Sequence, residues 1–322
     1  MPKESKSDPS RAISVVLPVK NAIKYINTLE KQLIQNISQH DEIIIVDDCS
    51  IDSTFSQFSF WARDKSQVQV VKNKNSGFVN ALNLGVSIAQ NDWIARWDQD
   101  DQYTPDRLKI QAKLLTINSV AVFSDFLLRT ELGETLGSIQ SPLFNSPTKI
   151  SIVGARRTAH SSAIFSKSAF DEVGGYLNED FLAEDISLWL RLSKLGNFSS
   201  TPFELLQYQI TNTSLSGLNQ TTSRNKKNEI IGRYRLSQTD INDLSLNWEE
   251  YFKQYEEYND AIRRKVFLFF DLISLYRSGY KISKNTLNRI LMLLLKEKEF
   301  IFCLNTVRLE RLKRKKARVG NL

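Results

Sequence analysis

Apolar runs and helical stretches alternate along the first third of the chain. Four runs predict strands, at 13–19, 42–48, 68–71 and 92–97, and the first of them is rich in β-branched residues and long enough for a buried strand. Between and after them, apolar residues recur at helical spacing in segments 23–37, 79–89 and 105–115, and a polar turn with Asp52 or Ser53 precedes a further short helix. This alternation predicts an α/β layered domain with a mainly parallel sheet.

The pattern changes in the middle of the chain and again near its end. We expect strands at 120–130 and 160–165, turns at 133–137 and 171–176, and an amphipathic helix over 183–196. A Ser/Thr/Asn-rich stretch follows. The sequence beyond Arg224 is poor in glycine, and its pattern predicts helices. We therefore predict a polar tail at 1–11, a main α/β domain at 12–220 and a basic helical extension at 221–322.

Composition narrows the class of protein. The 322 residues are 41% hydrophobic and 25% charged, as expected of a globular chain with a real core. The two cysteines, Cys49 and Cys303, argue against a disulfide scaffold or a cysteine-ligated zinc site, and they suit the cytoplasm. Two histidines cannot form a histidine-rich metal centre, so any metal must be a hard cation bound by oxygen. We expect neither a signal peptide nor a membrane span, because no apolar stretch is long enough.

Charge is unevenly distributed. Residues 223–322 hold 22 basic and 12 acidic side chains, a net +10, whereas the rest of the chain carries −3. Apolar helical faces beside the basic KRKKAR could lie on the cytoplasmic surface of an anionic membrane, or pack on the catalytic domain with a solvated basic end; we favour packing. Nucleic-acid binding is disfavoured, because the basic residues are not interleaved with stacking aromatics.

Three carboxylates follow the fourth predicted strand in the sequence DQDD, at Asp98, Asp100 and Asp101. Crowded carboxylates repel one another unless a cation neutralises them, and Mg²⁺ or Mn²⁺ commonly takes one or two carboxylates plus phosphate oxygens. A solvated acidic turn is the plainer alternative. An EF-hand is excluded, because Tyr103 and Lys109 occupy the positions that need Gly and Glu.

Asp47 and Asp48 end the second strand, where a carboxylate can accept hydrogen bonds from a nucleobase N–H or from ribose hydroxyls; a turn-capping role is equally compatible. The first strand is followed by PVKNAI, without the glycines of a dinucleotide fold, and no Walker loop is present. Polar clusters at 18–21, 47–50 and 98–101 should meet at one edge of a parallel sheet. We therefore expect metal and side chains, rather than a glycine cradle, to hold any phosphates.

Glu184 and Asp185 open the predicted helix at 183–196. A carboxylate at a helix start inside a pocket can act as a general base, although acids there also complement the helix dipole. His160, in a predicted strand, could contact substrate or be a structural histidine.

Taken in order, these segments resemble the large family 2 of inverting glycosyltransferases. The matching text is SVVLPVKNA, EIIIVDDCSIDST, NSGFVNALNLGVSIAQNDWIARWDQDDQYTPDRL, HSSAIFSKSAFDEVGGY and EDISLWLRL, which spans about residues 12 to 210. The resemblance implies a GT-A fold, which is a Rossmann-like mixed sheet flanked by helices that binds a nucleotide-diphospho-sugar. It also implies sugar transfer with inversion, with Mn²⁺ or Mg²⁺ as cofactor, in the assembly of bacterial cell-surface polysaccharides.

The resemblance assigns the donor side to matching positions. Pro18, Val19 and Asp48 would form the nucleobase pocket, usually for uracil, and Gly77 lies in the matching loop. Asp98 would face the ribose. Metal binding falls to the two acids at 100 and 101.

For the acceptor side, the resemblance implies that Asp185 is the general base and that Glu184, Trp189 and His160 shape the acceptor site. The acceptor would be a glycan or a lipid-linked glycan. Lys20 stands where small or aromatic residues are frequent in the family, and 75–77 lacks an arginine that is sometimes present.

Two rival functions remain open at this point. A non-catalytic sugar-binding or scaffolding module could retain the same fold, and it would be favoured if Asp100 or Asp185 lay outside any shared cleft. A sugar-phosphate nucleotidyltransferase needs a Gly-rich, arginine-bearing loop after the first strand, which this sequence lacks.

Overall fold

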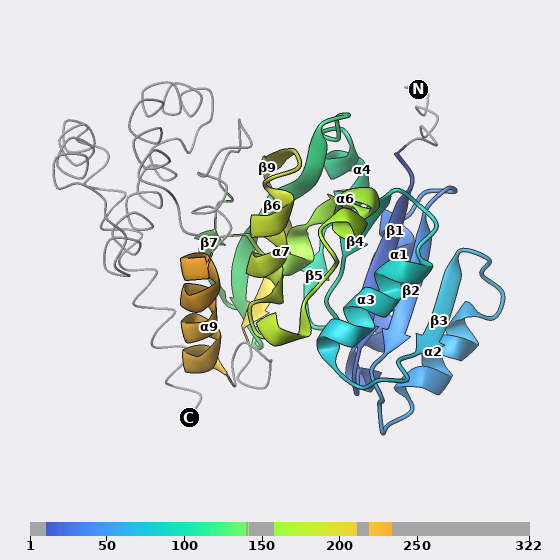
Figure 1. The fold of residues 1–322 in the computed structure, drawn as a ribbon. Coiled ribbons are helices and arrows are strands. Elements are labelled where there is room, and N and C mark those ends of the chain that lie inside the picture. Colours follow the sequence, from blue (N-terminus) through green and yellow to red (C-terminus); the bar gives the residue numbers. More distant parts are fainter. Residues whose placement is uncertain (1–10, 140, 142–157, 211–218, 234–322) are drawn as a thin grey trace, which may run out of the picture.

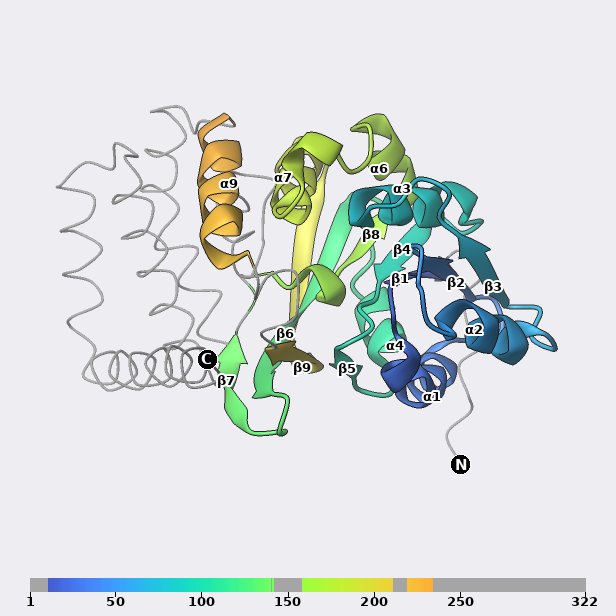
Figure 2. The same cartoon turned by 90° about the horizontal axis from the view of Figure 1, so that it is seen from below.

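The computed structural model describes residues 11–139, 141, 158–210 and 219–233. These residues form three layers. One mixed sheet of nine strands lies between two sets of helices (Figures 1 and 2). The strands follow the order β3-β2-β1-β4-β8-β6-β9-β5, and β7 pairs with β6.

The N-terminal half of the sheet is parallel. Its strands are β1 (Ile13–Val19), β2 (Glu42–Asp47), β3 (Val68–Lys72) and β4 (Trp93–Arg96). The helical connections are the 3-10 turn η2 (Ile23–Tyr25), α1 (Ile26–Asn36), α2 (Thr54–Ala62) and α3 (Phe78–Ile88). Every residue of β1 is buried, as the uninterrupted apolar run predicts for a strand covered on both faces.

The second half of the sheet is mixed. It comprises β5 (Gln102–Tyr103), β6 (Ser119–Thr130), β7 (Thr135–Ile139), β8 (Ile164–Ser166) and β9 (Asn197–Ile210). β8 runs antiparallel to β4 and β6 and so joins the two halves, whereas β6 and β9 are parallel. The remaining helical elements are α4 (Arg107–Ala112), η4 (His160–Ser162), α6 (Lys167–Glu172), η5 (Asn178–Asp180), α7 (Glu184–Leu192) and α9 (Gln220–Arg233).

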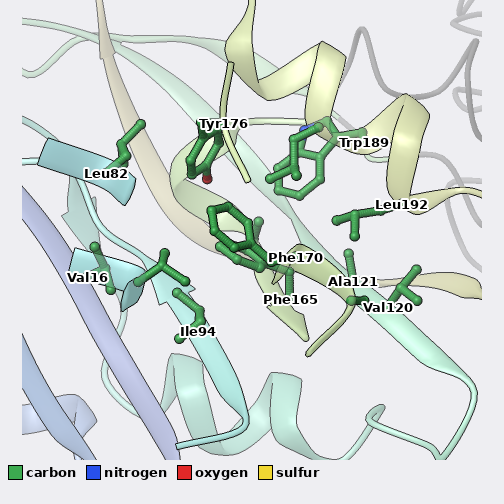
Figure 3. Close-up of a cluster of buried hydrophobic side chains, with 14 of the residues drawn as sticks. Val16, Leu82, Ile94, Val120, Ala121, Phe165, Phe170, Tyr176, Trp189 and Leu192 are labelled. Carbon is green, nitrogen blue, oxygen red and sulfur yellow. The ribbon is translucent and has the colours of Figure 1, made fainter. Parts of the chain in front are cut away.

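Two apolar cores lie on opposite faces of the sheet. Leu29 and Leu33 of α1, Phe58 of α2 and Leu108 of α4 belong to one core. The other core holds side chains from α3, α6 and α7, and Figure 3 shows Phe165, Phe170, Tyr176 and Trp189 grouped within it. Gly85 of α3 belongs to the close packing here, because a Cβ at this position would lie 2.5 Å from Val16 Cγ1.

The structure corrects several local predictions. Residues 160–165 are not one strand, because Ser162 and Ala163 donate back to Ala159 and His160 and form the η4 turn, which leaves a strand only from Ile164. Residues 133–137 are not all turn, since β7 already begins at Thr135.

The structure also differs from the prediction in where one helix begins and in two strands that were not predicted. α4 begins at Arg107, two residues after Pro105, and follows Asp106 in the left-handed region at φ 62°. β5 and β9 were not predicted at all, because two-residue β5 is too short for a pattern and β9 alternates poorly between buried and exposed positions.

The start of the predicted C-terminal extension packs on the catalytic domain. Ile230 of α9 is buried, and Ser223 donates a hydrogen bond of 2.8 Å to the carbonyl of Leu182, just before α7 (Figure 1). The rest of the extension, including KRKKAR, lies outside the described residues, as does the tail at 1–10. Among the described helices, none is long and apolar enough to cross a membrane.

Candidate active site

The three polar clusters at the strand ends are joined by hydrogen bonds. The backbone N–H of Lys20 donates to Gln99 Oε1 at 2.8 Å, and Asn21 N donates to Ser50 Oγ at 2.9 Å. Asp48 N donates to the carbonyl of Val19 at 2.8 Å. The prediction that these segments meet at one sheet edge is confirmed.

Pro18 creates a gap in the sheet that an arginine fills. Val16 pairs with Arg96 in the parallel ladder, and Trp97 N donates to the Val16 carbonyl, so the amide of residue 18 would donate to the carbonyl of Trp97. Proline has no N–H. That carbonyl instead accepts a hydrogen bond from Arg96 Nη1. The proline therefore helps to direct the arginine toward the strand end.

Asp48 is buried and held in one orientation. Its Oδ1 accepts hydrogen bonds from Asn73 Nδ2 at 2.8 Å and from Gly77 N at 2.7 Å. Gly77 has φ 136°, a conformation that side chains rarely adopt, so glycine is required to aim this N–H at the carboxylate. Its Oδ2 lies 3.6 Å from Lys20 Nζ. Asp48 Oδ1 is thus occupied by hydrogen bonds within the protein, whereas Oδ2 faces the ammonium group of Lys20.

The three acids of the DQDD segment differ in their hydrogen bonds and in their burial. Asp101 is buried, and both its oxygens accept hydrogen bonds, from Ser161 Oγ at 2.5 Å and from Gln209 N at 3.0 Å. Burial and the neighbouring charge of Asp98 raise the pKa of Asp100 to about 6. Burial and the charges of Asp98 and Asp100 also raise the pKa of Asp101 well above its usual range. The hydrogen bonds of Asp101 therefore anchor this segment to η4 and β9, and burial opposes the negative charge of both acids.

Arg96 supplies the fixed positive charge of the site. Its side chain is 1% exposed, and Nη2 donates to Asp98 Oδ1 at 2.6 Å. The guanidinium also lies over the Phe78 ring, 5.3 Å from the centroid, and its Nε has no hydrogen-bond partner among the described residues. Tyr103 OH accepts from Asp98 N at 2.7 Å and fixes the same segment from the other side. Arg96 was not among the site residues predicted from the sequence. An arginine inside an otherwise apolar strand could have indicated a buried functional charge.

Glu184 and Asp185 form a carboxyl pair at the start of α7. Glu184 is buried, and its Oε2 has no hydrogen-bond partner among the described residues. Burial, followed by the charge of Asp185, raises the pKa of Glu184 to about 7. Asp185 is half-buried, and its Oδ1 accepts from the N–H of Ile186 at 2.8 Å. Burial therefore favours the protonated form of Glu184 near neutral pH.

His160, Tyr176 and Trp189 form a group of rings under this pair. His160 Nε2 and Tyr176 OH are 2.7 Å apart, and the ring centroids of His160 and Trp189 are 6.0 Å apart. Burial and Arg96 lower the pKa of His160 well below its usual range, so the ring is neutral. Trp189 is fully buried and packs edge-on against Phe123, so its side chain is part of the apolar core.

Tyr176 and Arg96 connect the DQDD segment with the carboxyl pair. The charges of Asp98, Glu184 and Asp185 all raise the pKa of the Tyr176 hydroxyl, after burial as the main cause, and Arg96 opposes them. Arg96 likewise opposes the rise in the pKa of Glu184. Groups far apart in the sequence therefore act on one another electrostatically.

The acids fit a divalent cation held jointly with a ligand. Among the described residues, no three His, Cys, Asp or Glu side chains gather so that they could bind a metal alone. A Mg²⁺ or Mn²⁺ ion on a diphosphate needs only one or two carboxylates. The raised pKa of Asp100 shows uncompensated negative charge of the kind such an ion relieves.

Comparison with known proteins identifies the family. A family model described as "Glycosyl transferase family 2" matches residues 14–174, which is half of the chain. The chain belongs to glycosyl transferase family 2. It is therefore a glycosyltransferase, and the matched region contains the strand-end clusters described above.

Several curated relatives of this glycosyltransferase are bacterial. It is 24% identical over 255 residues to an uncharacterized glycosyltransferase of Haemophilus influenzae (73% of this chain, 77% of the relative). It is 26% identical over 211 residues to the putative teichuronic acid biosynthesis glycosyltransferase TuaG of Bacillus subtilis (63% and 81%). It spans 38% of the length of an uncharacterized glycosyltransferase of Rickettsia felis, at 28% identity over 73% of this chain. Relatives of this glycosyltransferase thus include one named for polysaccharide biosynthesis.

Solved structures confirm the GT-A fold. S. aureus TarS 1–349 in complex with UDP aligns with a TM-score of 0.53 at 18% identity, over 87% of this chain and 90% of that one. The mannosyltransferase PcManGT from Pyrobaculum calidifontis, in complex with GDP-Man and Mn²⁺, aligns with a TM-score of 0.56 at 13% identity, over 98% and 90%.

Proposed function

We propose that this glycosyltransferase is metal-dependent and inverting, and that it transfers a sugar from a nucleotide-diphospho-sugar, a UDP-sugar in the first instance, to an acceptor hydroxyl. The observation that carries this is the chain of contacts from the DQDD segment to α7. Ser161 donates to Asp101 at 2.5 Å, and neighbouring His160 lies 2.7 Å from Tyr176 OH and 6.0 Å, between ring centroids, from Trp189 of the helix that Glu184 and Asp185 begin. That link is what a transferase needs, because donor and acceptor must meet within one site.

The donor half is built on the ends of β1, β2 and β4. Pro18 and Val19 would line the base, Asp48 would accept its N–H, and Gly77 fixes the orientation of that carboxylate. Asp98, held by Arg96, would accept a ribose hydroxyl through its remaining oxygen. These groups position the donor and carry out no bond-making step.

Asp100 would hold the Mn²⁺ or Mg²⁺ ion together with the donor diphosphate. Asp101 is a weaker candidate, because Ser161 and Gln209 already occupy both of its oxygens. When bound, the ion would supply positive charge that stabilises the departing diphosphate. Arg96, whose Nε is buried and unpaired among the described residues, adds fixed positive charge nearby.

Asp185 would act as the general base. The acceptor hydroxyl oxygen attacks the anomeric carbon, its proton passes to Asp185, and the bond from that carbon to the diphosphate oxygen breaks, which inverts the configuration. Burial keeps a proton on neighbouring Glu184 up to a pH of about 7 and leaves the half-exposed Asp185 to accept the acceptor's proton. His160, neutral and paired with Tyr176, would contact the acceptor sugar.

The acceptor is proposed to be a glycan or lipid-linked glycan in bacterial cell-surface polysaccharide biosynthesis, as the name of the Bacillus relative suggests for that protein. The enzyme would act in the cytoplasm or at the cytoplasmic face of the membrane. The basic residues that would contact the membrane lie outside the described residues.

A donor screen with Mn²⁺ tests the proposal. Release of nucleoside diphosphate from UDP-, GDP- and dTDP-sugars is measured for the natural protein, Asp100→Ala and Asp185→Asn, with exposed Asp64→Asn as control. We expect both site variants to lose at least about 100-fold in turnover, as is usual for a general base, and Asp185→Asn to retain donor binding. Full activity without divalent ions would refute the metal's part, and normal turnover of Asp185→Asn would refute the base.

A non-catalytic module would bind sugar nucleotides without releasing diphosphate in this screen, even when supplied with bacterial glycan acceptors.

A further inference from the structure

The backbone of Lys20, whose side chain lies beside the candidate base-binding carboxylate, is held by two hydrogen bonds with one side chain. Its backbone N–H donates to Gln99 Oε1 at 2.8 Å, and its carbonyl accepts from Gln99 Nε2 at 3.2 Å. One amide side chain therefore pairs with both polar groups of the Lys20 backbone, much as a neighbouring strand would. Gln99 stands between Asp98 and Asp100, so the position of Lys20 is set relative to the DQDD segment.

The ion pair between Lys20 and Asp48 has one open side. Asn73 and Gly77 occupy Asp48 Oδ1, and Lys20 Nζ lies 3.6 Å from Oδ2. The side chain of Lys20 is 53% exposed and that of Asp48 is 9% exposed. A half-exposed pair of this kind contributes at most about 1 kcal/mol to stability, so fold stability does not account for the lysine.

We infer that Lys20 is a specificity-determining residue beside Asp48, and that it selects a donor base whose carbonyl stands next to the ring N–H that Asp48 accepts. This inference rests on the proposed function, because it takes the site to bind a nucleoside diphosphate sugar. Asp48 Oδ2 accepts from the ring N–H, and the Lys20 ammonium donates to the adjacent carbonyl oxygen. An acceptor and a donor side by side match such an edge in both positions.

Uracil, thymine and guanine all present this edge. Cytosine and adenine present the opposite one, a ring nitrogen acceptor beside an amino group. Placed in the same pocket, their amino group would face the Lys20 ammonium, donor against donor, and their ring nitrogen would face the Asp48 carboxylate, acceptor against acceptor. A site built to pair with specific polar groups rejects a ligand that leaves them unpaired. UDP, dTDP and GDP should therefore bind, and CDP and ADP should not compete.

The test measures nucleotide affinity by isothermal titration calorimetry with Mn²⁺ present, for UDP, GDP, CDP and ADP. The variants are Lys20→Met, which keeps the length of the side chain, and Lys31→Met as a control on an exposed position of α1. We expect the natural protein to bind UDP at least about tenfold more tightly than CDP, as one charged hydrogen bond predicts. Lys20→Met should lose about tenfold in UDP affinity and less than about twofold in CDP affinity.

The possible results of this experiment distinguish a failure of this inference from a failure of the proposed function. If Lys20→Met weakens UDP and CDP by the same factor, the lysine contacts the diphosphate and the inference is overturned. An unchanged UDP affinity in the Lys20→Met variant overturns it as well and leaves the proposed function intact. If no nucleoside diphosphate binds the natural protein, the proposed function itself fails.

Discussion

Replacing Glu184 by glutamine should remove a large pH dependence from the stability of the protein. Glu184 is 7% exposed, and its Oε2 lacks a hydrogen-bond partner among the described residues. Burial and the charge of Asp185 raise its pKa to about 7. Glutamine has nearly the same shape and no charge, so the change isolates the cost of ionising this group.

The sign and size follow from the difference between the folded and unfolded pKa values. The folded state holds the proton more tightly, so the free energy of unfolding falls as the pH rises from about 4.5 toward about 7 and above. About 2.5 pKa units at about 1.4 kcal/mol each give roughly 3 kcal/mol in total. Between pH 5 and pH 8 the loss should be roughly 2–3 kcal/mol.

Urea unfolding followed by tryptophan fluorescence at pH 5 and pH 8 measures this difference. Glu184→Gln should show a change between the two pH values that is smaller by roughly 2–3 kcal/mol than in the natural protein. An amide at a buried position has its own cost, but that cost is the same at both pH values and cancels. Exposed Glu172→Gln on α6 serves as the control and should retain the natural pH dependence. An identical pH dependence in Glu184→Gln would refute the assignment of the buried charge.

Three further predictions concern the packing and the acid segment. Gly85→Val should destabilise the protein by about 1–3 kcal/mol in thermal unfolding, because even its Cβ would lie 2.5 Å from Val16 Cγ1; an unchanged melting temperature would show that α3 is not so close to the sheet. Arg96→Met leaves Asp98 without its buried partner and should lower the free energy of unfolding by about 3 kcal/mol, with loss of UDP affinity in calorimetry. Tyr103→Phe removes the acceptor of the Asp98 N–H and should cost about 1–3 kcal/mol in urea unfolding; no change would mean that water replaces the hydroxyl.

The strands and helices of the first half could be predicted because each satisfies a local rule. β1 and β2 are buried on both faces, so their apolar runs are unbroken, and α1 shows its buried side at Leu29 and Leu33. β9 could not be predicted in the same way, since its residues vary in burial without a clear period and it is held in place by pairing with β6. Pairing between distant segments leaves little trace in local pattern.

The sequence alone determined which acids end up at the strand tips, because parallel strands joined by helices must bring their carboxyl ends to one edge. Which carboxylate atoms remain available was decided by the tertiary structure. Donors from distant segments already occupy Asp48 Oδ1 and both oxygens of Asp101, whereas the charge on Asp100 is left opposed by burial. Hydrogen bonds and electrostatic fields depend on distances in space, and folding alone sets those distances.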